Sequence, residues 1–184
     1  MFDIIWKSLL LVTATEMGDK TQLLALVLAT RYRRPWVIMA GILVATLLNH
    51  SLAAWVGQWI SQTISPELLQ WILAASFFAF ALWVLIPDKE DEPVYNSASG
   101  AFIVTLVSFF IAEMGDKTQL STIALAARFG DLMLVTIGTT LGMLIADGLA
   151  VFFGERLTQI VPMQKMRWIT SALFVVFGLL ILLQ

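Results

Sequence analysis

Acidic, basic, amide and hydroxyl side chains occur together twice in otherwise apolar stretches of this chain. The sequence EMGDKTQL runs from residue 16 to 23 and again, without a mismatch, from residue 113 to 120. Carboxylate, amide and hydroxyl oxygens are the ligands that hard divalent cations such as Mg²⁺, Ca²⁺ or Mn²⁺ prefer. The chain has no cysteine and one histidine, which excludes thiolate sites and a multi-histidine zinc site within one chain.

Both motifs lie near the middle of a long apolar segment. A charge at the centre of a membrane helix costs about 2.5–3.5 kcal/mol on insertion scales, so four carboxylates and two lysines at that depth indicate function. On a continuous helix, Glu16, Asp19 and Gln22 would follow one face with a drift of about 60° per step. The equivalent residues of the second motif would do the same, and the two faces together would form one oxygen-rich pocket. The predicted metal-binding residues are Glu16, Asp19, Thr21, Gln22, Glu113, Asp116, Thr118 and Gln119.

The lysines of the motifs allow a purely structural alternative. Lys20 follows Glu16 by four residues, and Lys117 follows Glu113 by four, so each motif could contain an internal ion pair on a helix. Such pairs leave the two aspartates unexplained. The four acids and two lysines sum to a charge of −2, which one divalent cation or two protons would neutralise. Lys20 and Lys117 are therefore assigned to charge balance.

A glycine interrupts each motif, Gly18 in the first and Gly115 in the second. Glycine costs about 1 kcal/mol relative to alanine inside a helix. Two interpretations remain open: the helix bends or breaks here and frees backbone carbonyls as ligands, or the glycine permits close approach of another helix.

Composition identifies a polytopic membrane protein. The 184 residues are 59% hydrophobic and 13% charged, whereas about a quarter of a soluble domain is charged. The net charge of −2 gives no basic surface for nucleic acid. The N-terminus lacks the basic region of a signal peptide and is expected to begin the first span. Six segments are long enough to cross a bilayer as helices, and the alternating pattern of a β-barrel is absent. These spans are 4–29, 36–60, 67–86, 101–127, 132–155 and 166–183.

The chain is an internal repeat with an offset of 97 residues. Besides the motifs, this offset pairs Arg31 with Arg128, and it also aligns two phenylalanines in the last span of each half. We therefore divide the chain into a three-helix repeat at 1–87, an acidic linker at 88–99 and a second three-helix repeat at 100–184. Because three is odd, the second repeat enters the membrane from the opposite side. The predicted fold is all-α, with six transmembrane helices in two inverted repeats, and such transporters bind substrate near the midplane.

Loop charges predict the orientation. Seven lysines and arginines lie in the loops after spans one, three and five, against two on the opposite face. Because cytoplasmic loops carry the positive excess, both termini are expected outside the cytoplasm.

The second helix of each repeat carries two further features. Small residues recur nearly every fourth position from Gly41 to Gly57 and from Gly138 to Gly154, which favours close helix packing. His50 and Asp147 are equivalent under the offset and are titratable, so they could relay protons. Asn49, beside the histidine, joins them in this second set of candidates.

The paired motif resembles that of the small cation/proton exchangers, whose pattern is E-x-G-D-[KR]-[ST]. Here it reads EMGDKT at residues 16–21 and 113–118. The resemblance covers the whole chain and includes bacterial MneA-type manganese exporters and eukaryotic Golgi members linked to Mn²⁺ and Ca²⁺ supply. It implies that Glu16, Asp19, Glu113 and Asp116 bind a transported divalent ion, and that the short form is a manganese exporter of a bacterial inner membrane.

The leading hypothesis is therefore a secondary transporter, and not an enzyme, that exports Mn²⁺ in exchange for protons. A Ca²⁺/H⁺ antiporter on the same scaffold is the alternative. An intramembrane aspartyl protease is opposed by the lysine beside each acid, and an amino-acid exporter is opposed by four midplane carboxylates. Its partners would be a divalent ion and the lipid bilayer, with the monomer or homodimer state left open.

Overall fold

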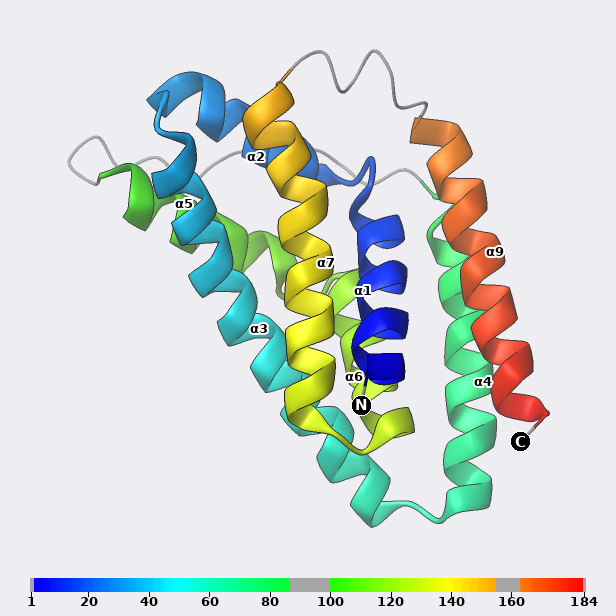
Figure 1. Ribbon diagram of the computed structural model, residues 1–184. Helices are drawn as coiled ribbons and strands as arrows, with labels where there is room; N and C mark the ends of the chain where they lie inside the picture. Colours follow the sequence, from blue (N-terminus) through cyan, green and yellow to red (C-terminus); the bar gives the residue numbers. More distant parts are fainter. Residues whose placement is uncertain (1, 87–99, 155–162, 184) are drawn as a thin grey trace.

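The described part of the chain is entirely helical. The computed structural model describes residues 2–86, 100–154 and 163–183, and every regular element in those ranges is an α-helix (Figure 1). The predicted acidic linker at 88–99 lies outside the described residues, as does the segment 155–162.

Four helices are long and apolar enough to cross a membrane, in agreement with four of the predicted spans. Proline occupies the first turn of two of them, where its missing N–H removes no hydrogen bond. The first of the four has 29 residues, which at 1.5 Å per residue is about 44 Å, and it runs obliquely through the bundle (Figure 1). These helices are α3 (Pro35–Thr63), α4 (Pro66–Trp83), α7 (Leu132–Phe153) and α9 (Met163–Leu182).

The other two predicted spans, 4–29 and 101–127, are not continuous helices. Each is interrupted inside the EMGDKT motif, so that the acid ends one helix and the lysine begins the next. Gly18 and Gly115 have φ angles of 86° and 82°, a conformation that residues with a Cβ rarely adopt. Apart from its chain neighbours, no atom of the described residues lies within 4 Å of a Cβ built on Gly115, so close packing within that part of the chain does not explain this glycine. The four helices are α1 (Phe2–Glu16), α2 (Lys20–Tyr32), α5 (Ala101–Glu113) and α6 (Lys117–Phe129).

Helices pack mainly against partners from the other half of the chain. Helix α1 lies along α7, α3 lies along α6 and α5, and α4 lies along α9 (Figure 1). The start of α1 and the end of α9 lie in the lower half of Figure 1, opposite the ends of α4 and α7 that lead into the undescribed segments. This cross-packing brings the two motifs to the centre of the molecule.

The small residues of α3 and α7 permit these contacts. A Cβ on Gly41 would lie 2.8 Å from Cβ of Thr105 in α5, and one on Gly138 would lie 2.8 Å from Cβ of Ser8 in α1. Real Cβ atoms do not approach so closely. The predicted role of these glycines in close helix packing is confirmed.

Aromatic rings join α4 to α9. The rings of Phe77 and Phe177 have centroids 5.6 Å apart, and those of Phe80 and Phe174 are 5.7 Å apart. These are the phenylalanines that the 97-residue offset equates, so the two contacts are repeat-equivalent and nearly equal in length.

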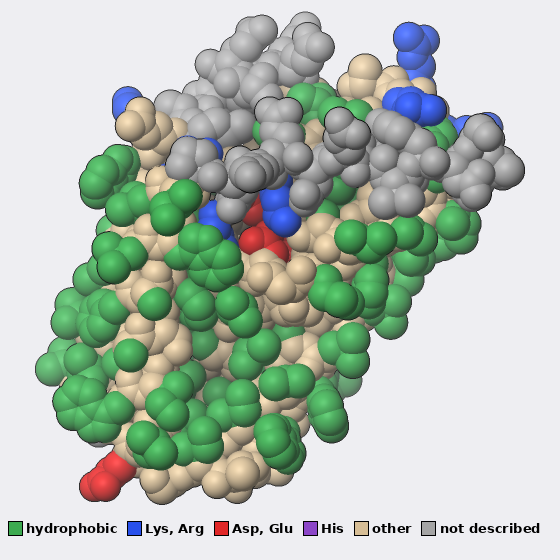
Figure 2. Space-filling view, turned by 180° about the vertical axis from the view of Figure 1, so that it is seen from behind, with side chains coloured by type: hydrophobic (Ala, Val, Ile, Leu, Met, Phe, Trp, Pro, Cys, Tyr) green, Lys and Arg blue, Asp and Glu red, His purple; other side chains and the backbone are tan. Residues whose placement is uncertain are grey.

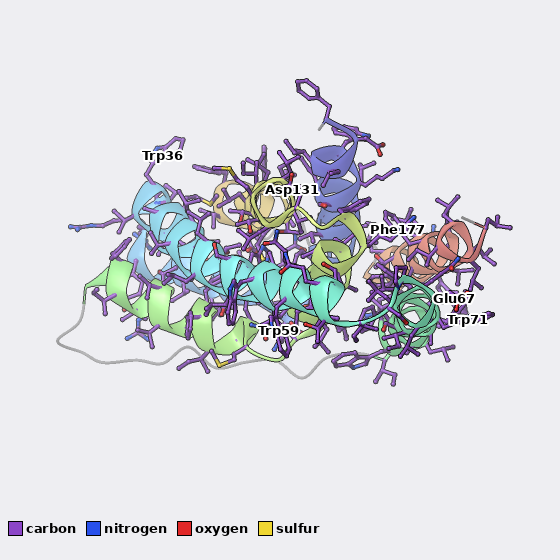
Figure 3. All side chains as sticks on the ribbon, turned by 90° about the horizontal axis from the view of Figure 1, so that it is seen from below. Trp36, Trp59, Glu67, Trp71, Asp131 and Phe177 are labelled. Carbon is purple, nitrogen blue, oxygen red and sulfur yellow. The ribbon has the colours of Figure 1, made fainter. Side chains whose placement is uncertain are left out.

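The outside of the bundle is apolar. Hydrophobic side chains cover most of the face shown in Figure 2. Six tryptophans are at least 59% exposed, and the labelled ones among them lie on the outside of the bundle in Figure 3. Tryptophan is enriched where membrane proteins meet the headgroup region. The exposed tryptophans are Trp6, Trp36, Trp55, Trp59, Trp71 and Trp168.

Candidate functional site

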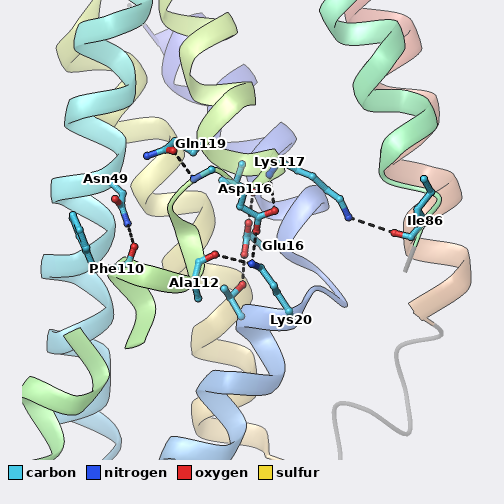
Figure 4. Close-up of polar contacts among 12 residues, drawn as sticks. Glu16, Lys20, Asn49, Ile86, Phe110, Ala112, Asp116, Lys117 and Gln119 are labelled. Atoms are coloured by element: carbon cyan, nitrogen blue, oxygen red, sulfur yellow. Dashed lines mark hydrogen bonds and ion pairs between the residues drawn. The ribbon is translucent and has the colours of Figure 1, made fainter. Parts of the chain in front are cut away.

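The two broken helices leave backbone groups at the centre of the bundle without helical partners. One glutamine of each motif satisfies such a group. The side-chain oxygen of Gln22 accepts a hydrogen bond from Gly18 N at 2.9 Å, and that of Gln119 accepts from Gly115 N at 2.7 Å (Figure 4). The glutamines, predicted as metal ligands, thus hold the two breaks in this structure.

The carboxylate of Glu16 is bound by hydroxyls from both repeats. Thr21 donates to one oxygen at 2.6 Å, and Thr118 donates to the other. All three residues are fully buried. The structure thus brings together predicted site residues that lie about one hundred positions apart in the sequence.

Lys20 also reaches across the repeats. Its ammonium donates to the carbonyl oxygen of Ala112 at 2.7 Å and lies 3.7 Å from Oδ2 of Asp116 (Figure 4). Because the chain leaves the helix between Glu16 and Lys20, the predicted i,i+4 geometry does not exist. The ion pair shown for this lysine joins it to the other repeat, so it makes a contact that the structural alternative of a pair inside one motif did not include.

Lys117, the repeat-equivalent lysine, has different neighbours. Its ammonium donates to the carbonyl oxygen of Ile86 at 3.4 Å and lies 5.8 Å from the centroid of the Trp83 ring. Asp116 accepts from the backbone N–H of Lys117 at 2.6 Å and caps α6. Two motifs with one sequence are therefore in two different environments.

Asp19 lines a small pocket beside this centre. Its walls come from the break between α1 and α2 and from the ends of three other helices. Figure 2 shows acidic and basic side chains together in a recess of the otherwise apolar surface. The residues that line the pocket are Thr15, Met17, Gly18, Asp19, Val84, Lys117, Arg167 and Thr170.

Three buried titratable side chains have no hydrogen-bond partner in the described structure. They are Glu113 at the end of α5, His50 in α3 and Asp147 in α7, and each is fully buried. Removing a polar group from water without a partner is costly. Each of these three side chains therefore carries a desolvation cost in this conformation.

Asn49 has an identifiable structural contact. Its side-chain nitrogen donates to the carbonyl oxygen of Phe110 at 3.1 Å, near the end of α5 (Figure 4). The carbonyl oxygens in the last turn of a helix have no partner within it. In this conformation Asn49 therefore caps the broken helix, and no contact with a proton-carrying group is shown for it.

Two of the four motif carboxylates form bridges in this conformation, and the described residues show no closed metal cage. Across the described ranges, no three His, Cys, Asp or Glu side chains are grouped closely enough to hold a metal ion. The carboxylates of Glu16 and Asp116 lie instead in bridges between the repeats, with hydroxyl or ammonium groups as partners, whereas the described structure shows no hydrogen-bond partner for Glu113. A cation can enter such a centre by replacing the hydrogen-bond donors that face the carboxylates.

Comparison with known proteins gives the family. The profile described as divalent cation/proton antiporter GDT1 matches residues 4–92 and 101–184. This chain belongs to the GDT1 family. The resemblance carried by the paired motifs is thereby confirmed, as is the prediction of a membrane transporter and not an enzyme.

Relatives within the GDT1 family span bacteria and plants. A Vibrio cholerae protein named "Putative manganese exporter" is 46% identical over 94% of this chain and 86% of its own length. A GDT1-like protein of Synechocystis, sll0615, is 29% identical over 92% of both chains. GDT1-like protein 3 of Oryza sativa subsp. indica is 25% identical over 97% of this chain and 73% of its own length. No solved structure matches the chain.

Several contacts of this GDT1 member lie outside the set predicted from sequence. The carbonyl oxygens of Ala112 and Ile86 accept from the motif lysines, and Thr170 donates to the carbonyl oxygen of Ala14 at 2.6 Å. A backbone acceptor has no signature in side-chain identity. Only the glycines inside the motifs indicated that carbonyls would become available there.

Proposed function

We propose that this protein exports Mn²⁺ from the cytoplasm in exchange for protons, with both EMGDKT motifs contributing to one ion site. Metal binding displaces protons from the carboxylates, and reprotonation of the empty site returns the transporter to its starting state. An unpaired charge at the membrane centre is costly, so the site must hold one kind of cation or the other. Exchange of one divalent ion for two protons matches the −2 charge of the two motifs.

The contact between Thr118 and Glu16 carries this proposal. It joins a predicted ligand of one repeat to a predicted ligand of the other, inside the bundle and beside two interrupted helices. Lys20 and Asp116 make a second such bridge. Discontinuous helices that meet at a repeat interface are where secondary transporters bind their ions.

The packing of α4 on α9 supports six crossings in two inverted repeats. Equivalent ring pairs have centroid distances of 5.6 and 5.7 Å, as a two-fold axis would give, although their interplanar angles are 23° and 58°. Helices α1 with α2, and α5 with α6, would each provide one broken crossing. The repeats would then occupy 1–87 and 100–184, with the acidic linker between them.

The choice of Mn²⁺ over Ca²⁺ rests on the relatives. The 46%-identical Vibrio protein is named as a manganese exporter, whereas oxygen ligands suit either ion. We place the protein in a bacterial inner membrane with both termini outside the cytoplasm, because of the positive charges in three loops. Two inverted repeats in one chain could form the site as a monomer, and a homodimer is equally compatible.

Purified protein in liposomes provides the test. A metal-sensitive dye inside the vesicles reports Mn²⁺ entry under an imposed pH gradient, with Ca²⁺ added as competitor. We expect flux that follows the gradient, flux near the protein-free background for Glu113→Gln, and little inhibition by Ca²⁺. The exposed Asp3→Asn, which removes the partner of Lys7 at the protein surface, is the matched control and should transport normally.

Each part of the proposal has its own contradictory result. Mn²⁺ flux that ignores the pH gradient would exclude proton exchange. Stronger uptake of Ca²⁺ than of Mn²⁺ would reverse the assignment of the substrate. Normal transport by Glu113→Gln would remove that residue from the site.

A further inference from the structure

Two cavities open beside each other at the end of the bundle where α1 begins and α9 ends, which is the end that Figure 3 views. The larger, of about 370 Å³, lies between the start of α4 and the ends of α6 and α9. The smaller, of about 290 Å³, lies between the start of α1 and the same two ends. Arg128 and Ile181 line both cavities, so the two meet around one arginine side chain. Ligand pockets in proteins begin at about 300 Å³, so the larger cavity can hold part of an organic molecule.

The larger cavity combines apolar walls with one cation. Leu69 and Leu73 of α4 and Ile181 of α9 supply hydrocarbon surface. The side-chain nitrogen of Gln70 donates to the carbonyl oxygen of Ile181 at 2.8 Å, which ties α4 to the end of α9. Arg128 is half-buried, and its guanidinium makes no hydrogen bond or ion pair with the described residues. The cavity therefore presents an uncompensated positive charge beside apolar walls.

The smaller cavity adds no net charge. Lys7 and Asp3 line it, and their side chains form an ion pair at 2.7 Å. Arg128 is the remaining charged residue in the two linings. A guanidinium carries its donors in a fork that fits two phosphate oxygens at once. The ligand that complements these walls has an anionic phosphate and a hydrocarbon chain. A zwitterionic headgroup fits less well, because its ammonium would need an acid, and Asp3 already binds Lys7.

Tryptophans place this end of the bundle at the depth of lipid headgroups. Trp6 precedes Lys7 in the chain, Trp71 follows Gln70, and both tryptophans are at least 59% exposed. Trp71 lies on the outside of α4 in Figure 3. Exposed tryptophans mark the level where the hydrocarbon of a membrane meets its headgroups. An anionic phosphate with a hydrocarbon chain is, at this depth, a phospholipid, whereas a free phosphate ion would leave the apolar walls unused.

We propose that the larger cavity binds one anionic phospholipid, with the phosphate on Arg128 and one acyl chain between α4, α6 and α9. This site is separate from the motif centre, and it does not depend on the proposed export of Mn²⁺. Helix α6 begins at the second motif and ends one residue after Arg128, whereas α4 and α9 form the aromatic contact. The bound lipid therefore joins a motif helix to the contact between α4 and α9.

Lipid affinity tests the role of the charge. Native mass spectrometry of the delipidated full chain in micelles, without Mn²⁺, measures binding of phosphatidylglycerol and of phosphatidylcholine with the same acyl chains. We expect phosphatidylglycerol to bind about tenfold more tightly, and Arg128→Met to remove that preference. Arg31→Met is the matched control, because Arg31 is the repeat-equivalent residue in the last turn of α2 and lines neither cavity. Its substitution should change the affinity by less than about twofold.

Three results would contradict recognition of the phosphate by Arg128. Equal affinity for the two lipids, or an unchanged preference in Arg128→Met, overturns the proposal. An equal loss in Arg31→Met also overturns it, because any arginine near the membrane surface would then suffice. Arg128→Lys keeps the charge and should retain part of the preference. A loss in Arg128→Lys as complete as that in Arg128→Met would show that the charge is not what binds the lipid.

A filled cavity tests the position of the acyl chain. Leu69→Trp adds bulk to the cavity wall, leaves every charge in place and should weaken phosphatidylglycerol binding about tenfold. Its matched control is Leu68→Trp at the neighbouring residue, which is 54% exposed and lines neither cavity, and the affinity should then change by less than about twofold. Glycerol phosphate, a headgroup without chains, should not displace the lipid at equal concentration. Unchanged binding by Leu69→Trp, or displacement by glycerol phosphate, would assign Arg128 to a phosphate without its chain and overturn the proposal.

Discussion

The α4–α9 contact and the motif centre obey the internal repeat to different degrees. On α4 and α9, the repeat-equivalent pairs Phe77–Phe177 and Phe80–Phe174 have centroid distances of 5.6 and 5.7 Å, and they differ in ring orientation, with interplanar angles of 23° and 58°. At the centre, equivalent residues have different partners: Glu16 accepts from two threonines, whereas Glu113 has no hydrogen-bond partner in the described structure. Sequence identity is higher at the centre, where EMGDKTQL is repeated without a change.

This difference distinguishes a scaffold from a moving part. A contact that looks the same from both repeats is unchanged when the repeats exchange their conformations. Under the proposed transport cycle, a contact that satisfies one repeat and not the other would have to be remade. Substituting both members of a repeat-equivalent pair of residues, one at a time, and comparing the two effects shows whether a region is symmetric or asymmetric between the repeats.

The largest effect is expected at the aromatic contact between α4 and α9. Phe77→Ala and Phe174→Ala each remove a fully buried ring and should lower the free energy of unfolding by about 3–5 kcal/mol. Because the two sites are equivalent, the two losses should agree within experimental error. Denaturation of the purified protein in micelles measures both, and a clear inequality would mean that the scaffold is itself asymmetric.

The two buried glutamates should respond with opposite signs. Glu16→Met leaves two threonine hydroxyls without their acceptor and should lower stability by about 1–3 kcal/mol. Glu113→Met removes a buried carboxylate that has no hydrogen-bond partner in the described structure, and should raise stability. Thermal unfolding of the metal-free variants measures the difference.

Transport complements that comparison. Both glutamate variants should lose Mn²⁺ transport, because the proposed site needs both acids at some stage of the cycle. A lower stability of the Glu113→Met variant than of the Glu16→Met variant would contradict the asymmetry seen at the centre.

Much of the architecture follows from the sequence, because the length of each apolar segment and the repeated motif can be read directly along the chain. The α3, α4, α7 and α9 helices agree with spans predicted from apolar length. The continuous helices predicted at 4–29 and 101–127 were wrong, because each is interrupted inside its motif. Gly18 pointed to the break, but glycine also serves close packing, and sequence alone could not separate these alternatives.

The partners of the motif residues were less predictable, for a physical reason. Because the two motifs are identical, the sequence does not indicate that Lys20 contacts Asp116, or that both threonine hydroxyls donate to Glu16 and not to Glu113. These contacts are properties of the conformation seen here. The Ala112 carbonyl became an acceptor only because α5 ends there. Contacts that depend on a conformational state or on freed backbone groups are therefore absent from residue patterns.

The smallest effect is expected at the glutamines that hold the two breaks. Gln119 accepts from Gly115 N, whereas Gln22 accepts from Gly18 N and also donates to the Ala146 carbonyl at 2.9 Å. A hydrogen bond contributes about 0.5–1.5 kcal/mol net, so Gln22→Met should destabilise the protein about 1 kcal/mol more than Gln119→Met does. Hydrogen exchange of the Gly18 and Gly115 amides reports on the two helix breaks directly. Each variant should increase the exchange rate of the glycine amide that its glutamine binds. If either variant leaves that exchange unchanged, its glutamine does not hold the break and becomes free to act as the metal ligand that the sequence predicts.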